Sequence, residues 1–289
     1  MPPASARSDL FRRLAVIAGP GEPETLYDRH GVLVVRAGDV VAKAHQADRD
    51  GGPLLARRLA VAAALPDLLL PPLGPPRVVD GRTVTRWPYG EPVSPADPPW
   101  EEGGRLLALL HRAPVPGDAP AWGRPTRVVR LVARLGGGPA EDEVRRAFAT
   151  LPAWIRGEAP VPPARAETLV HGDWHLGQMV RAGGRWLLID VEDLGVGDPA
   201  WDLARPAALY LAGVLDPGDW ARFLTAYQEA GGPLAADVWS DLDVPARTLV
   251  VQIAATCVQS AREAGRPLEE PEQALVAACR RISRMGGPA

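Results

Sequence analysis

Lysine and asparagine are almost absent from this chain. Its 289 residues include 32 Lys plus Arg, of which Lys43 is the only lysine, and they include no asparagine. Arginine therefore stands at the other basic positions, yet Lys43 lies in the middle of an apolar run, GDVVAKAHQ. Lysine carries a compact point charge and arginine a broad planar fork, so one retained lysine indicates a role that a guanidinium cannot fill.

Cysteine and long apolar runs are scarce as well. Cys257 and Cys279 both lie in apolar helical patterns, which excludes a disulfide framework and favours two free thiols in a reducing cytosol. The start, MPPASARSDLFRRL, lacks the apolar core of a signal peptide. The longest apolar run, residues 59–73, is broken by Pro66 and Asp67 and cannot span a membrane. We therefore expect a soluble, cytoplasmic protein.

The chain also lacks a basic tail or a basic run. Its net charge is −3 and its pI about 6.0, which argues against nucleic acid or an anionic membrane as a partner. With 46% hydrophobic residues the chain can bury a sizeable core, and its length suggests two lobes. Composition leaves the oligomeric state open.

Residues 1–87 have the pattern of a small β-rich lobe. Two β-rich runs, residues 31–37 and 39–45, predict a hairpin whose second strand contains Lys43. Residues 53–65 predict a helix that ends before a proline, and residues 76–87 predict two more strands around an Asp-Gly turn. We interpret this lobe as nucleotide-binding, for the chemical reasons given below.

Residues 88–98 are rich in proline and form a predicted connector, after which the pattern becomes helical. The predicted second lobe, residues 99–289, is interrupted between 166 and 198, where the runs TLVH and RWLLID predict two short strands that pair across a loop. Helices are expected after it at about 199–213, 218–230, 243–264 and 272–284. The predicted fold class is therefore α+β, with a β-rich N-terminal lobe and a larger helical C-terminal lobe.

Polar residues are densest in two stretches, LVHGDWHLGQMV and WLLIDVEDLGVGDPAWDLARP. Asp173 follows a short strand and Asp190 ends another, so both carboxylates can point into a cleft. One can act as a base and the other as a ligand for a hard cation such as Mg²⁺, whose shell the amide of Gln178 can complete. Together with Lys43 these groups suit phosphoryl transfer from ATP to a hydroxyl.

These two stretches resemble the aminoglycoside phosphotransferase/choline kinase family, which has a bilobal protein-kinase-like fold. The motif HGDxHLGQ is also similar to the loop of maltokinase-like sugar kinases. The resemblance implies that Asp173 is the catalytic base and that His171 and Gly172 shape its loop. His171 and His175 are four residues apart, but no glutamate follows His171 as a zinc metalloprotease helix requires.

The same resemblance implies a metal site and a phosphate site. Asp190 and Gln178 would hold Mg²⁺, and Lys43 would hold the phosphates of ATP. The family usually has asparagine where this chain has Gln178. Glutamine offers the same amide oxygen on a side chain that is one methylene longer, so it can still bind a metal ion.

Backbone groups of Trp87 to Gly90 would bind the adenine edge by the same resemblance. Pro88 has no N–H. The expected donor is therefore Tyr89 or Gly90.

One departure from the family concerns the partner of Lys43. The family pairs this lysine with a glutamate on the helix of the N-terminal lobe, but residues 51–66 contain no acid. Two alternatives stay open: Asp48 or Asp50 substitutes for this glutamate, or Lys43 is held by another group. The missing glutamate also favours an alternative function, a catalytically inactive kinase-like protein that binds or senses a nucleotide.

The acceptor stays open between an aminoglycoside-like antibiotic and a sugar, in either case a small molecule with a hydroxyl group. Glu192 and Asp193 are candidates to face the substrate or a second metal ion. Asp198 and Asp202 are predicted to cap and brace the following helix. Specificity is expected from residues 113–165 and from the C-terminal helices.

Overall fold

The computed structural model describes residues 4–29, 31–47, 52–123, 127–163 and 167–285. They divide into two compact units. Unit 1 comprises residues 1–98, 116–120 and 177–194, and unit 2 comprises residues 99–115, 121–176 and 195–289. The chain therefore contributes the stretch after Leu176, which carries Gln178 and Asp190, to the same unit as Lys43.

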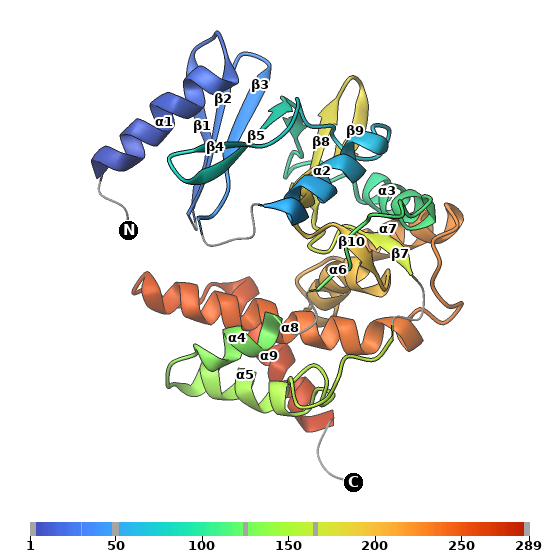
Figure 1. Ribbon diagram of the computed structural model, residues 1–289. Helices are drawn as coiled ribbons and strands as arrows, with labels where there is room; N and C mark the ends of the chain where they lie inside the picture. Colours follow the sequence, from blue (N-terminus) through green and yellow to red (C-terminus); the bar gives the residue numbers. More distant parts are fainter. Residues whose placement is uncertain (1–3, 30, 48–51, 124–126, 164–166, 286–289) are drawn as a thin grey trace. The chain divides into compact units, whose positions relative to one another are not determined.

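Unit 1 contains a five-stranded antiparallel sheet with the strand order β1-β2-β3-β5-β4 (Figure 1). Its strands are β1 (Pro23–Arg29), β2 (Val32–Ala37), β3 (Val40–Ala44), β4 (Arg77–Val79) and β5 (Arg82–Pro88). The predicted hairpin is formed by β2 and β3, and the predicted strands around Asp80 and Gly81 are formed by β4 and β5. Lys43 of β3 lies directly opposite Thr85 of β5.

The two faces of this sheet carry different kinds of side chain. Side chains alternate along a strand, so Ala42 and Ala44 point to one face, where they pack with Val35 and Val84 against α1 (Ala4–Ala18). Lys43 and His45 point to the other face, together with Thr85 and Trp87 of the neighbouring strand. The alternation that builds the core on one side thus collects polar side chains on the other.

A second, three-stranded sheet in unit 1 corrects one prediction. The strand RWLL, β9 (Arg185–Leu188), pairs with β8 (Met179–Ala182) and not with the strand that precedes His171. Gly183 and Gly184 join β8 to β9 with positive φ angles of 57° and 77°, the backbone of a tight hairpin turn. Strand β6 (Glu91–Pro92) completes the sheet beside β8. The sequence signal that was missed is the Gly-Gly pair.

Helix α2 (Pro53–Ala64) lies in unit 1 where a helix was predicted. Pro53 occupies its first turn and Leu65 ends it before Pro66. Arg58 of this helix donates two hydrogen bonds from its guanidinium group. Its Nε donates to the carbonyl of Leu194 at 2.9 Å, and its Nη1 donates to the carbonyl of Glu192. The helix therefore fixes the backbone of the segment that follows Asp190.

Unit 2 is mainly helical. Its helices are α3 (Trp100–Arg112), α4 (Arg127–Ala133), α5 (Pro139–Ala149), α6 (Ala200–Ala212), α7 (Pro217–Glu229), α8 (Trp239–Glu263) and α9 (Glu270–Met285). Figure 1 shows α8 as a long helix that runs beside α4, α5 and α9. Helix α8 begins at Trp239, four residues before the predicted start at about residue 243, and it contains Pro245.

One small sheet in unit 2 carries the predicted catalytic loop. Strand β7 (Thr168–Val170) leads into His171 and pairs antiparallel with β10 (Gly195–Gly197). Strand β10 in turn leads into Asp198, whose Oδ1 accepts a hydrogen bond of 3.0 Å from the N–H of Ala200. Asp198 thus holds the first residue of α6, whereas the N-cap position that was predicted for it is occupied by Pro199.

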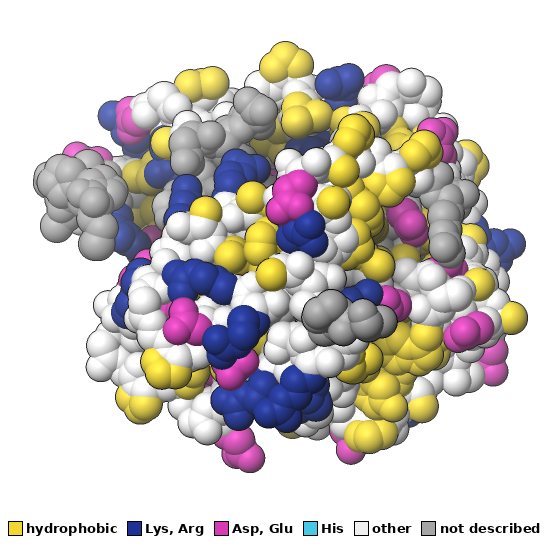
Figure 2. All heavy atoms as spheres, turned by 90° about the horizontal axis from the view of Figure 1, so that it is seen from below, with side chains coloured by type: hydrophobic (Ala, Val, Ile, Leu, Met, Phe, Trp, Pro, Cys, Tyr) yellow, Lys and Arg dark blue, Asp and Glu magenta, His cyan; other side chains and the backbone are white. Residues whose placement is uncertain are grey.

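The surface charges are paired locally. On the face shown in Figure 2, dark blue guanidinium groups lie next to magenta carboxylates. In unit 2, Arg146 and Arg280 both contact Glu143 at 3.0 Å. Within the described residues no helix is both long enough and apolar enough to cross a membrane.

Candidate active site

The Lys43 ammonium of unit 1 is held by two carboxylates. Its Nζ lies 2.8 Å from Asp190 Oδ1 and 2.6 Å from Glu192 Oε1, and its side chain is 15% exposed. Burial lowers the pKa of Lys43, but the charges and hydrogen bonds of Asp190 and Glu192 outweigh it and leave the pKa raised. The lysine is therefore a fixed cation at neutral pH.

Glu192 is the acidic partner of Lys43, which the sequence reasoning sought elsewhere. Asp48 and Asp50 lie outside the described residues. Glu192 was one of two candidates to face a substrate or a second metal ion; in the structure it is buried and its Oε1 contacts both Lys43 and His45. The other candidate, Asp193, is also buried and lies beside it in the 3₁₀ turn η2 (Val191–Asp193).

A buried hydrogen-bond chain continues from Glu192 into the sheet. His45 Nδ1 lies 2.6 Å from Glu192 Oε1, His45 Nε2 lies 2.8 Å from Thr85 Oγ1, and Trp87 Nε1 donates to Thr85 Oγ1 at 2.9 Å. The Thr85 hydroxyl accepts from Trp87, so its own proton is available for His45 Nε2. This assigns the proton of a neutral His45 to Nδ1, which donates to Glu192.

Electrostatics keep Glu192 ionised. Burial alone raises the pKa of a carboxyl group, but the hydrogen bond from His45 and the charge of Lys43 hold the pKa of Glu192 below its usual value. A negative Glu192 next to Lys43 is therefore the acidic partner of this lysine, the position that a helix glutamate has in the family described above. The signal in the sequence is the alternation Lys43-Ala-His45, which places both side chains on one face of β3.

Asp190 lies at a sharp change of backbone direction between β9 and η2. Its φ of 60° is in the left-handed region, which aspartate tolerates better than most residues. Gln178 Nε2 donates to Asp190 Oδ2 at 3.2 Å, and the N–H of Ile189 donates to the carbonyl of Gln178 at 2.9 Å. The structure therefore brings together Lys43, Asp190 and Gln178, which the sequence predicted to act together.

The donor set around Asp190 suits Mg²⁺. The Asp190 carboxylate and the Gln178 amide offer oxygen, the ligand that this hard cation prefers, and Mg²⁺ commonly takes only one or two protein ligands besides water and phosphate. Rotation of the amide about its terminal bond exchanges its nitrogen for its oxygen toward the metal position. We therefore retain both residues as candidate ligands.

Two of the predicted adenine-binding residues of the connector already donate hydrogen bonds within the protein. Trp87 is buried in β5 with its indole N–H donated to Thr85. The backbone N–H of Tyr89 donates to the carbonyl of Asp39 at 2.8 Å, so it continues the sheet. Arg36 stacks over the Tyr89 ring with its Cζ 3.4 Å from the centroid. Of the two predicted backbone donors, Tyr89 is thus engaged within the sheet, and the adenine contact of Gly90 stays a prediction.

In unit 2, the predicted base Asp173 lies in a loop held by one buried carboxylate. Asp202 Oδ2 accepts from the N–H of His171 at 2.6 Å, and Asp202 Oδ1 accepts from the N–H of Gly172 at 2.7 Å. Gly172 has a φ of 86°, which a side chain would disfavour. Asp202 was predicted to brace its own helix, and its observed contacts instead fix the backbone that precedes Asp173.

Asp202 is itself oriented by a chain of two side chains, His111 and Tyr227, which the sequence analysis did not single out. His111 Nε2 lies 3.0 Å from Asp202 Oδ2, and His111 Nδ1 lies 2.8 Å from the Tyr227 hydroxyl. Burial, followed by the charges of Asp202, Asp198 and Asp241, raises the pKa of Tyr227. The Tyr227 hydroxyl therefore stays protonated and donates to His111, whose other nitrogen donates to Asp202.

Asp173 is held by arginine. Arg205 Nη2 donates to Asp173 Oδ1 at 2.8 Å, and Arg127 Nη1 lies 3.9 Å from Asp173 Oδ2. Arg205 follows Asp202 by three residues on α6, so one helix turn supplies both the loop anchor and the contact to Asp173. The sequence showed no signal for this arginine beyond its spacing.

The geometry can be compared with that of known proteins. A model of the phosphotransferase enzyme family matches residues 77–244, more than half of the chain. Among solved structures, a choline/ethanolamine kinase family protein from Mesorhizobium loti is 18% identical, with 98% of this chain and 95% of that chain covered and a TM-score of 0.62.

Two further structures are similar over the same length. Aminoglycoside phosphotransferase APH(4)-Ia is 12% identical, with 99% of each chain covered and a TM-score of 0.64. Amicoumacin kinase is 15% identical, with 98% of this chain and 96% of that chain covered and a TM-score of 0.61. At such identities the likeness shows the fold, and it confirms the predicted α+β, protein-kinase-like fold class.

Proposed function

The chain belongs to the phosphotransferase enzyme family, and from this premise we propose that it transfers the γ-phosphate of ATP to a hydroxyl group of a small molecule. The observation that carries the proposal is the cluster in unit 1, where the only lysine of the chain contacts Asp190 at 2.8 Å. A cation beside a candidate metal-binding carboxylate is what a polyphosphate with its metal ion requires.

The nucleotide and the metal ion would be held by unit 1. Lys43 would bind phosphate oxygens as a point charge, and the backbone of Gly90 would donate to the adenine edge. Asp190 and Gln178 would hold Mg²⁺, which when bound neutralises phosphate charge. Amicoumacin kinase, which is similar in fold, was solved with AMP-PNP and Ca²⁺, and this supports a nucleotide and a divalent cation here.

The reaction would use Asp173 as the base. The acceptor oxygen forms a bond to the γ-phosphorus while the bond from that phosphorus to the β,γ-bridging oxygen breaks, and ADP leaves with the electron pair. The hydroxyl proton passes to the Asp173 carboxylate. Asp202, through the N–H groups of His171 and Gly172, would keep this carboxylate in place during transfer.

The acceptor is proposed as a class only. Aminoglycoside-like antibiotics and sugars are the two candidates from the sequence, and APH(4)-Ia, which is similar in fold, is named as an aminoglycoside phosphotransferase. The alternative of an inactive nucleotide sensor depended on a missing acid beside Lys43. Glu192 supplies an acid at 2.6 Å from Lys43 Nζ, so the observation that favoured the alternative no longer holds.

The test is a search for product. Purified protein is incubated with Mg-ATP and a panel of aminoglycosides, sugars and amino alcohols, and a mass increase of one phosphate is sought by mass spectrometry. Asp190→Asn, purified identically, controls for contaminating kinases, because asparagine accepts the left-handed backbone at this position. Binding of Mg-ATP without a phosphorylated product from any acceptor in the panel would contradict the proposed function.

A further inference from the structure

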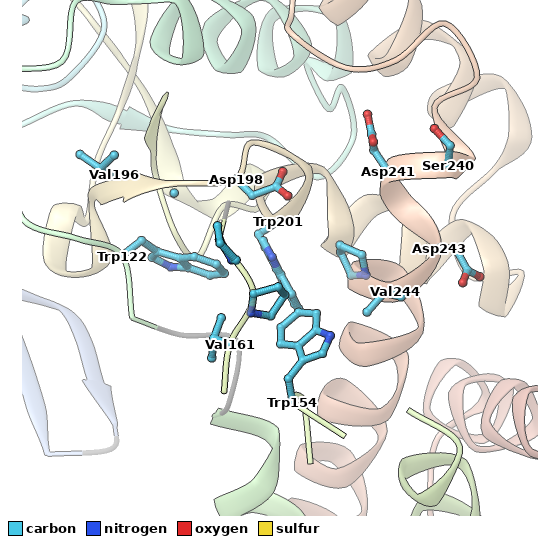
Figure 3. Close-up of a pocket in the computed structure, with 14 residues that line it drawn as sticks. Trp122, Trp154, Val161, Val196, Asp198, Trp201, Ser240, Asp241, Asp243 and Val244 are labelled. Carbon is cyan, nitrogen blue, oxygen red and sulfur yellow. The ribbon is translucent and has the colours of Figure 1, made fainter. Parts of the chain in front are cut away.

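Unit 2 contains a cavity of about 520 Å³ that the chemistry above leaves unassigned. This volume falls in the range of pockets that bind drug-sized ligands. Its walls come from the loop around Trp122, the segment after α5, the start of α6 and the first turns of α8 (Figure 3). These parts of the chain include the regions from which acceptor specificity was expected.

Three tryptophans form one continuous aromatic wall of this cavity. The ring centroids of Trp122 and Trp201 are 5.3 Å apart, and those of Trp154 and Trp201 are 6.2 Å apart with the rings nearly perpendicular. Trp122 packs so closely on the backbone of β10 that a Cβ on Gly197 would lie 3.1 Å from it. Prolines and valines make up most of the remaining lining, so the cavity is predominantly apolar.

The charges that line the cavity have one sign. Its ionisable side chains among the described residues are Asp198, Asp241 and Asp243. Asp243 is paired with Arg247 at 3.0 Å, Asp198 accepts from the N–H of Ala200, and Asp241 accepts from the N–H of Ala235. After burial, the negative charges of Asp198 and Asp241 help to raise the pKa of the neighbouring Tyr227. In Figure 3 the carboxylates of Asp198 and Asp241 lie toward one end of the cavity and the indoles of Trp122 and Trp154 toward the other.

A much smaller cavity lies beside the predicted base and shares two lining residues with the large cavity. It has a volume of about 20 Å³ and is lined by Asp173 and Arg205, together with Trp122 and Trp201 of the aromatic wall. Space of this size holds one water-sized group, such as a hydroxyl. The Trp122–Trp201 pair therefore separates room for a ligand body from room for a single hydroxyl beside Asp173.

We propose that the large cavity binds the acceptor and selects an amphipathic amino alcohol, a molecule with an apolar body, a protonated amine and a hydroxyl. This inference rests on the proposed function and narrows its acceptor class. Tryptophan faces attract cations more strongly than other aromatic rings do, and the carboxylates add charge of the matching sign. An unsubstituted sugar lacks the cation, and a polycationic aminoglycoside lacks an apolar body to cover the valines and prolines.

The test measures binding without nucleotide, so that it does not depend on catalysis. Propranolol, which has an aryl body, one amine and one hydroxyl, is titrated into the protein by calorimetry and compared with its neutral N-acetyl derivative. We expect saturable binding of propranolol and affinity for the derivative about tenfold lower, a difference of about 1.4 kcal/mol, because the derivative lacks the cation that the tryptophan faces attract. Kanamycin and maltose are expected to bind more weakly than propranolol.

Two variants test whether the preference for propranolol over its N-acetyl derivative arises in the cavity. Asp241→Asn keeps an oxygen for the N–H of Ala235, and it should weaken propranolol about fivefold while leaving the N-acetyl derivative unchanged. Glu229→Gln, an exposed substitution on α7 with the same change of charge, should alter neither. Equal affinity for the two ligands, no saturable binding of propranolol, or an effect of Glu229→Gln equal to that of Asp241→Asn would overturn the inference.

The outcomes separate this inference from the proposed function. Phosphorylation of kanamycin or maltose without binding of propranolol would leave the phosphotransferase intact and refute the amino-alcohol class. Selective binding of propranolol that depends on Asp241, without phosphorylation of any acceptor, would support the cavity assignment and refute the transfer reaction. Each experiment thus decides its own claim.

Discussion

Each of the two polar clusters of this protein contains a chain of hydroxyl, imidazole and carboxylate, called a relay below, but the two carboxylates hold different groups. In unit 1, the hydroxyl of Thr85 meets His45, and His45 meets the carboxylate of Glu192. In unit 2, the hydroxyl of Tyr227 meets His111, and His111 meets the carboxylate of Asp202. Each relay fixes one proton of an imidazole and orients one buried carboxylate.

What each carboxylate holds is different. Glu192 holds the ammonium of Lys43, a charge on a flexible stem. Asp202 accepts from the backbone N–H groups of His171 and Gly172, which are part of the loop that leads to Asp173 and move only with it. The difference teaches that the first relay positions a ligand-binding charge and the second a backbone conformation. Damage to the first should therefore appear mainly in nucleotide affinity, and damage to the second mainly in turnover.

Asp173→Asn should give the largest effect. Asparagine keeps the shape and one acceptor oxygen but cannot take the proton of the acceptor hydroxyl. We expect kcat to fall by about 10³-fold, within the usual range for loss of a general base, with the thermal shift by Mg-ATP unchanged. A coupled assay for ADP release measures the rate. A variant within threefold of the native rate would show that Asp173 is not the base.

Lys43→Arg should give the second largest effect and should act on the other parameter. The guanidinium keeps the charge but cannot occupy the space between Asp190 and Glu192 in the same geometry. We expect the KM for ATP to rise about tenfold or more, a loss of at least about 1.4 kcal/mol of binding. Steady-state kinetics at varied ATP checks this. Unchanged kinetics would remove the reason given for the single lysine.

Glu192→Gln and Asp202→Asn test the comparison directly, since both replace a relay carboxylate by its amide. The first should raise the KM for ATP about tenfold, because Lys43 loses a charged partner. The second should lower kcat about tenfold, because an amide nitrogen would face a loop N–H. Parallel kinetics on both variants provide the check. If both variants changed the same parameter to the same degree, the distinction between the two relays would be lost.

The stability of unit 1 should depend on pH through Glu192. Its pKa is lowered in the folded state, so its contribution is complete above the ordinary carboxyl pKa of 4.5 and is lost as the pH falls through the lower folded value. Native protein should therefore exceed Glu192→Gln in stability at pH 7, and the gap should narrow below about pH 4. Urea unfolding at several pH values measures the gap, and a constant gap would argue against an ionised Glu192.

Much of this molecule could be predicted from its sequence, for reasons that are local. The motifs around Asp173 and Asp190 predicted the family, and the match of the phosphotransferase enzyme family over residues 77–244 confirms that prediction. Alternation along residues 39–45 located the strand of Lys43. The similarity to maltokinase-like loops and the individual site roles stay predictions.

The parts that could not be predicted depend on long-range contacts. Glu192 lies 147 residues from His45 and takes the place of an acid that was sought in the nearest helix. His111 and Tyr227, which are 116 residues apart, meet only through the packing of α3 and α7. Spacing along the chain has no signal for either contact. A sequence pattern therefore located the reactive groups but not the residues that orient them.

Thr85→Val and Tyr227→Phe should give the smallest effects and the finest comparison. Each removes the hydroxyl at the outer end of one relay, and each leaves a buried imidazole nitrogen without its partner, at a cost of about 1–3 kcal/mol of stability. Thr85→Val should cost more, because Trp87 Nε1 also loses its acceptor. We expect a two- to fivefold rise in the KM for ATP from Thr85→Val and a similar fall in kcat from Tyr227→Phe, about 0.5–1 kcal/mol each. Thermal unfolding and steady-state kinetics of the two variants, measured side by side, would test these expected changes in stability, KM and kcat. A fall in kcat from Thr85→Val with no change in the KM for ATP would mean that the unit 1 relay does not act through Lys43.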